Sequence, residues 1–113
     1  CAVVVESIEE FDTVTFPVTV SGTITPSPTC KWVKFEGQGG TAILKDEDGN
    51  LASDMAILNI AGDWMNTDPF TFSVTLTPTG PMTGDTGYVY FEDANQANPE
   101  ENPTRAYAFG INF

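Results

Sequence analysis

The segment FTFSVTL, residues 70–76, alternates without interruption between apolar side chains and Thr or Ser. Successive side chains of a β-strand point to opposite faces of a sheet, so this period of two predicts a strand with one buried and one solvent-facing side. A strand of this kind is stable only when other elements cover its apolar side. Other elements of the fold must therefore cover the side formed by Phe70, Phe72, Val74 and Leu76.

The chain of 113 residues fits one all-β domain. Short segments rich in Val, Ile, Thr and aromatic residues alternate with turn residues, which predicts about seven short strands and favours a β-sandwich, with a closed barrel as the alternative. Asp48-Gly49 predicts a hairpin turn. The glycines of residues 37–40 predict a bulge or a close backbone approach.

The chain is strongly acidic, with sixteen Asp and Glu residues against four Lys and Arg and a net charge of −12. Such a surface repels phosphate backbones, so nucleic acid and anionic membranes are not expected as partners. Solubility is the simplest role of the charge. The longest apolar run, Ala2 to Val5, is far shorter than the roughly 20 residues of a membrane-spanning helix.

The two cysteines, Cys1 and Cys30, leave three interpretations open. A disulfide, within one chain or between neighbouring chains, indicates an oxidising compartment. A lipid anchor on Cys1, as in a bacterial lipoprotein cut at its cysteine, would leave Cys30 alone. Two unrelated thiols are the third interpretation. The first two place the protein at the cell surface or in the extracellular space, which is the location we expect.

The N-terminal arm, residues 1–12, precedes the predicted sandwich of residues 13–113. Its apolar, β-branched start predicts a strand that pairs within the chain or completes a neighbour's sheet by strand addition. In the second case, contacts that do not close between copies would build a filament. The residues that would form such an exchange strand are Ala2, Val3, Val4, Val5 and Ile8.

Four landmarks occur in order along the chain: FPVTVSGTI, FEGQGGTAILKDEDGNLA, GDWMNTDPFTFSVTL and GYVYFEDANQANPEENP. Together they resemble the immunoglobulin-like domain of bacterial spore germination, the second of the domains named for germination and sporulation proteins. The resemblance covers residues 16–113. It departs from the family pattern at Phe16-Pro17, at Cys30 and in the late loop, which lacks the usual Ser-Gly. It implies a non-catalytic, extracytoplasmic immunoglobulin-like β-sandwich.

Several loop residues are candidates for binding. Trp64 is expected to bury its ring over the end of the sandwich, and the alternative is a ligand platform formed by Trp64 and Met65. Acidic and amide side chains could also hold calcium, although the glycine spacing around residue 48 departs from a calcium loop and favours a hairpin tip. The calcium candidates are Asp46, Asp48, Asn50, Asp93 and Glu100.

Catalysis has no motif to support it. The chain has no histidine, so it cannot form a Ser-His or Cys-His pair, and no cofactor is expected. We therefore predict a binding or structural module of the cell surface, whose partner is a protein or the chain itself. The alternatives are a filament subunit joined by its N-terminal strand and a calcium-dependent binding module.

Overall fold

The computed structural model describes residues 2–25, 38–59, 69–82, 84–93 and 106–113. These residues form strands and loops without a helix, which confirms the all-β prediction. The seven strands are β1 (Ala2–Val5), β2 (Val18–Thr25), β3 (Gln38–Lys45), β4 (Ala56–Asn59), β5 (Phe70–Leu76), β6 (Thr86–Glu92) and β7 (Ala106–Asn112).

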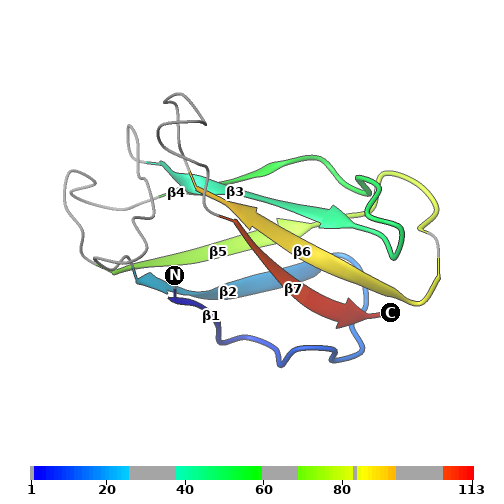
Figure 1. Cartoon of the computed structure of the whole chain (residues 1–113), viewed down its shortest axis with the longest axis horizontal. Coiled ribbons are helices and arrows are strands. Elements are labelled where there is room, and N and C mark those ends of the chain that lie inside the picture. Colours follow the sequence, from blue (N-terminus) through cyan, green and yellow to red (C-terminus); the bar gives the residue numbers. More distant parts are fainter. Residues whose placement is uncertain (1, 26–37, 60–68, 83, 94–105) are drawn as a thin grey trace.

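The strands form two antiparallel sheets that pack as a sandwich (Figure 1). The first sheet has the order β1-β2-β5, and the second has the order β4-β3-β6-β7. Strands β1, β2 and β5 thus take the places of strands A, B and E of an immunoglobulin domain, and β3, β6 and β7 take those of C, F and G. The predicted immunoglobulin-like sandwich of about seven strands is confirmed.

The core lies between the two sheets. The segment FTFSVTL forms β5, and its burial alternates as predicted, with each apolar residue buried and each hydroxyl residue exposed. Phe72 of this strand meets Phe91 of β6 across the core, with ring centroids 5.2 Å apart in an edge-to-face arrangement. The core side chains with at most 1% exposure are Val20, Ile24, Ala42, Leu44, Leu58, Val89, Phe91 and Ile111.

The start of β3 carries the predicted irregularity. Its pairing with β4 shifts register between Gln38 and Thr41. A side chain at Gly39 would enter the ring of Phe70, and Gly40 has a φ of 113° and lies against the backbone of β6. The bulge and the close approach are confirmed for these glycines.

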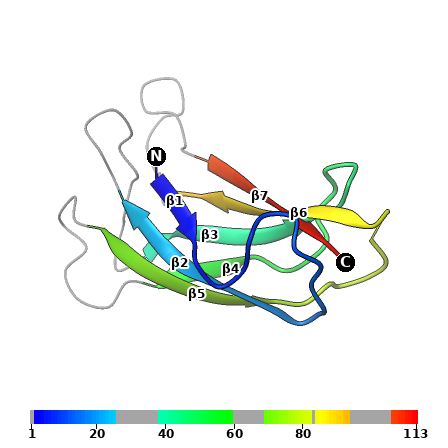
Figure 2. The same ribbon diagram turned by 90° about the horizontal axis from the view of Figure 1, so that it is seen from below.

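A strap formed by residues 2–14 joins the two sheets. Its strand β1 pairs with β2, and the chain then crosses to the end of β7, where Val14 donates a 2.8 Å hydrogen bond to the carbonyl of Asn112 (Figure 2). The strand ends at Val5, because the N–H groups of both Glu6 and Ser7 turn to the carbonyl of Ser21. The strap therefore belongs to both layers of the sandwich.

Candidate functional site

The outer face of the β1-β2-β5 sheet, here called the hydroxyl face, is covered by Ser and Thr. Along β2 and β5 the outward positions pair in register, and Thr19 and Thr75 share a hydrogen bond of 2.9 Å between their hydroxyls. No charged side chain occupies the outward positions of these two strands. The paired residues of the ladder are Thr19 with Thr75, Ser21 with Ser73, and Thr23 with Thr71.

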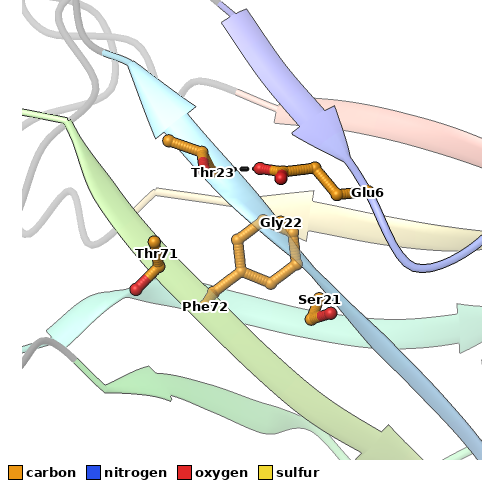
Figure 3. A pocket seen from close by; sticks show the side chains of 6 residues that line it. All are labelled: Glu6, Ser21, Gly22, Thr23, Thr71 and Phe72. Carbon is orange, nitrogen blue, oxygen red and sulfur yellow. Dashed lines mark hydrogen bonds between the residues drawn. The ribbon is translucent and has the colours of Figure 1, made fainter.

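A shallow hollow of about 240 Å³ lies on the hydroxyl face around Gly22. Figure 3 shows Glu6 reaching from the end of β1 toward Thr23, whose hydroxyl donates a 2.6 Å hydrogen bond to the carboxylate. A side chain at Gly22 would overlap the carbonyl of Val4, so glycine is required where β1 leaves the sheet. The hollow thus follows from the crossing of the strap.

The outer face of the β4-β3-β6-β7 sheet, here called the apolar face, has a different chemistry. Its outward positions on β3 and β6 are half-buried, and β7 contributes small residues. Among the described strand positions on this face, Lys45 and Glu92 are the charged ones. The strand register arranges the face in three rows: Leu51, Lys45, Tyr88 and Gly110; Ile43, Tyr90 and Ala108; and Ile57, Thr41, Glu92 and Ala106.

The apolar face contains a hollow of about 160 Å³ near its β4 edge. Lys45 lies over the ring of Tyr90, with its amino group 3.7 Å from the ring centroid. This cation–π contact fixes the ring as one wall of the hollow. The hollow is lined by Thr41, Ile43, Lys45, Leu51, Met55, Tyr90 and Glu92.

Phe11 lies at the opposite edge of the apolar face. Its N–H donates a 2.8 Å hydrogen bond to the carbonyl of Gly110, and its ring occupies the space that a side chain at Gly110 would need. The residue has a φ of 64° and is 50% exposed. Such a backbone conformation is rare for a large side chain, so the surrounding hydrogen bonds must hold it in place.

The residues predicted for strand exchange lie in the strap. In this structure β1 pairs with β2 of the same chain in the register Val3 to Ile24 and Val5 to Gly22. Val3 is buried, Val5 and Ile8 pack against the core, and Val4 is 51% exposed on the hydroxyl face. For Ala2 the structure gives the pairing with Thr25.

The acidic loop around residue 48 is a hairpin tip. The Asp46 carboxylate accepts hydrogen bonds from the N–H groups of Asp48 and Asn50, at 3.0 and 2.9 Å. Gly49 takes a φ of 83°, and Leu51 pairs back onto Lys45. The predicted hairpin is confirmed, and the side chain of Asp46 caps its turn.

The other candidate residues are only partly described. Asp93 is buried directly after β6. Cys1, Cys30, Trp64, Met65 and Glu100 lie outside the described residues. Within the described ranges no group of three or more His, Cys, Asp or Glu side chains is placed to hold a metal ion.

The exposed hydrophobic residues of the apolar face were not predicted from the sequence. Leu51 and Met55 flank turns, Ile57 lies in a wholly apolar stretch, and Phe11 follows two glutamates. The strongest available signal was the unbroken apolar run of residues 55–58, which leaves one of its faces uncovered. Ser53 was missed as well: its buried hydroxyl accepts the N–H of Leu44 and donates to the carbonyl of Asp54, at 2.9 and 3.0 Å.

The chain was compared with protein-family models, curated proteins and solved structures, and none of them matches it. No helix in the described part of the chain is long and apolar enough to span a membrane.

Proposed function

We propose that this chain is a non-catalytic, extracytoplasmic immunoglobulin-like module that acts as a cell-surface binding or structural protein, and that the apolar face is its binding surface. The observation that supports this proposal is that, among the described residues, four of the five exposed large hydrophobic side chains lie on this face, while the fifth, Val4, lies on the hydroxyl face. The exposed fractions of the four are 50% for Phe11, 68% for Leu51, 63% for Met55 and 45% for Ile57. Apolar side chains that gather on one exposed face are typical of interaction sites in soluble proteins.

The chemistry of the face favours a protein partner. The hollow combines aliphatic walls, a methionine and a tyrosine ring, which together suit an inserted apolar or aromatic side chain. Lys45 and Glu92 stand at its border and can orient the partner's polar groups. The immunoglobulin-like fold does not itself identify a partner, because one fold serves many functions.

The test is selection of binding peptides from a random phage-displayed library on the dilute, immobilised wild-type protein. We expect peptides rich in apolar and aromatic residues that bind the wild type and lose binding to Met55→Asp. The matched control is Val4→Asp, which places the same charge at a similarly exposed position on the hydroxyl face. Failure to select peptides, or selection of peptides that bind Met55→Asp equally well, would refute the proposed binding surface.

A filament subunit is the second candidate, supported by the position of β1 at the edge of its sheet. In a filament, β1 of one copy would make the same pairing with β2 of the next copy. Deletion of residues 1–12 separates the cases. A self-paired monomer should unfold on deletion, whereas a filament subunit should stay soluble and lose its ability to polymerise.

A further inference from the structure

We propose that the partner of the apolar face is a second copy of this chain, docked face to face as a two-fold dimer. This inference rests on the proposed role of the apolar face as a binding surface and names its occupant. It concerns the outer surface of the β4-β3-β6-β7 sheet and is separate from strand exchange through β1. Two properties of the face support it: its charge and the shape of its two edges.

The low net charge of the apolar face favours an uncharged partner surface. The chain carries a net charge of −12, yet the three rows of the apolar face carry one positive and one negative side chain. A cationic partner would be attracted to acidic residues such as Glu10, Asp12 and Asp54, which flank Phe11 and Met55 at the edges of the face, rather than to its neutral rows. A neutral apolar surface is its natural complement, and every copy of the chain presents one.

The two edges of the face complement each other in shape. Phe11 projects over β7, at one edge of the face, and the hollow lies at the other edge, beside Leu51 and Met55. The hollow has a volume of about 160 Å³. An apolar cavity of about 150 Å³ accommodates a benzene molecule, so the hollow is of the size that a phenyl ring requires.

A two-fold axis that lies between two such faces, parallel to the strands, places Phe11 of each copy near the hollow of the other copy. This operation places β7 of one copy over β4 of the other and preserves the level of each row along the strands. Phe11 and Leu51 lie in the same row, because Gly110 beneath the Phe11 ring aligns with Tyr88, Lys45 and Leu51. Each Phe11 ring therefore meets the hollow of the other copy, and the contact is made twice.

The same operation places the charged side chains of the rows opposite uncharged ones. Lys45 on β3 comes to face β6 of the second copy, where its row holds Tyr88, and Glu92 comes to face the row position of Thr41. Two sheet faces then pack about 10 Å apart, as in the interior of a sandwich. The remaining acidic residues repel across the whole dimer, so association should strengthen as salt screens them.

The test is sedimentation velocity over a concentration series at low and at high salt, with reductant present so that a disulfide cannot produce the dimer. We expect a monomer–dimer equilibrium that shifts toward dimer at high salt. Phe11→Ala and Met55→Asp should each raise the dimer dissociation constant about tenfold or more, because each substitution removes a contact that the two-fold dimer makes twice. Val4→Asp should leave the salt-screened dimer intact.

Circular dichroism and thermal melting of each variant exclude unfolding as the cause of lost association. A wild type that stays monomeric at every concentration and salt would overturn the inference, as would variants that dimerise like the wild type. If the chain is monomeric but selected peptides still bind in a Met55-dependent way, the proposed binding surface holds and the second copy is the wrong partner. If the chain stays monomeric and no selected peptide binds in a Met55-dependent way, the apolar face is not a binding surface.

Discussion

The hydroxyl face and the apolar face are the two solvent sides of one sandwich, yet they follow different rules. On the hydroxyl face, β2 and β5 present paired Ser and Thr side chains, the usual exterior of an antiparallel sheet with one buried side. On the apolar face, Leu51, Met55 and Ile57 are 68%, 63% and 45% exposed. Folding needs only the inner side chains to be apolar, so the gathering of apolar residues on one outer face is the feature on which the proposed binding role depends.

A substitution in the core, which lies between the two sheets, should lower the free energy of unfolding the most. Phe91 is completely buried and contacts Phe72 and Tyr107. We expect Phe91→Ala to lower the free energy of unfolding by about 3–5 kcal/mol, because a large cavity replaces the ring. Phe11→Ala removes a half-exposed ring and should cost about 1 kcal/mol or less. Chemical denaturation measures both, and equal losses would contradict the assignment of Phe11 to the surface.

A substitution at Gly22, where the strap crosses β2, should disturb the hydroxyl face and leave the apolar face intact. The Cβ of Gly22→Ala would overlap the carbonyl of Val4, so β1 must shift away from β2. We expect a loss of about 1–3 kcal/mol from this overpacking. Gly80→Ala is the matched control, because its Cβ would meet no atom within 4 Å. Denaturation curves in which the two variants coincide would refute the tight crossing.

The hairpin that carries Leu51 to the apolar face depends on Asp46. Asp46→Ala should cost about 1–3 kcal/mol, because it leaves the N–H groups of Asp48 and Asn50 without their carboxylate acceptor. Asp48→Ala, at an exposed position of the same turn, should change stability by about 0.5 kcal/mol or less. Thermal melts of both variants, with calcium and with chelator, measure these losses. A melting temperature that rises with calcium in the wild type and not in Asp46→Ala would instead support the calcium-dependent alternative.

A substitution among the paired hydroxyl side chains of the hydroxyl face should lower the free energy of unfolding the least. Thr75→Ala removes the 2.9 Å hydrogen bond to Thr19 between two exposed side chains. Such a cross-strand pair contributes about 0.2–1 kcal/mol, so denaturation should show a small loss and sedimentation no change in association. A change in association would mean that the hydroxyl face also binds, and the contrast between the faces would fail.

The inner architecture could be predicted from sequence because its signals are local. The alternation of residues 70–76 fixes the buried side of β5, and Asp48-Gly49 fixes a tight turn. The glycines before Thr41 likewise mark the bulge of β3. Each of these signals depends on a few neighbouring residues, so no tertiary contact is needed to interpret them.

The apolar face could not be predicted because its signals are not local. Periodicity separates the two sides of a strand, but it does not tell whether another element covers the outer side. The short strand β4 is apolar at three of its four positions, so its sequence alone leaves the exposure of Ile57 undecided. The placement of Phe11 depends on Gly110, almost the whole chain away. Trp64 and Met65, the predicted ligand loop, lie outside the described residues.

The most direct test of the contrast between the faces is a dilution series followed by two-dimensional amide NMR at high salt. The account predicts concentration-dependent shifts at outward positions of β3 and β6, around Ile43 and Tyr90, and at Phe11, with the Ser and Thr positions of β2 and β5 unchanged. Shifts confined to β2 and β5, or a spectrum that does not change with concentration, would contradict it.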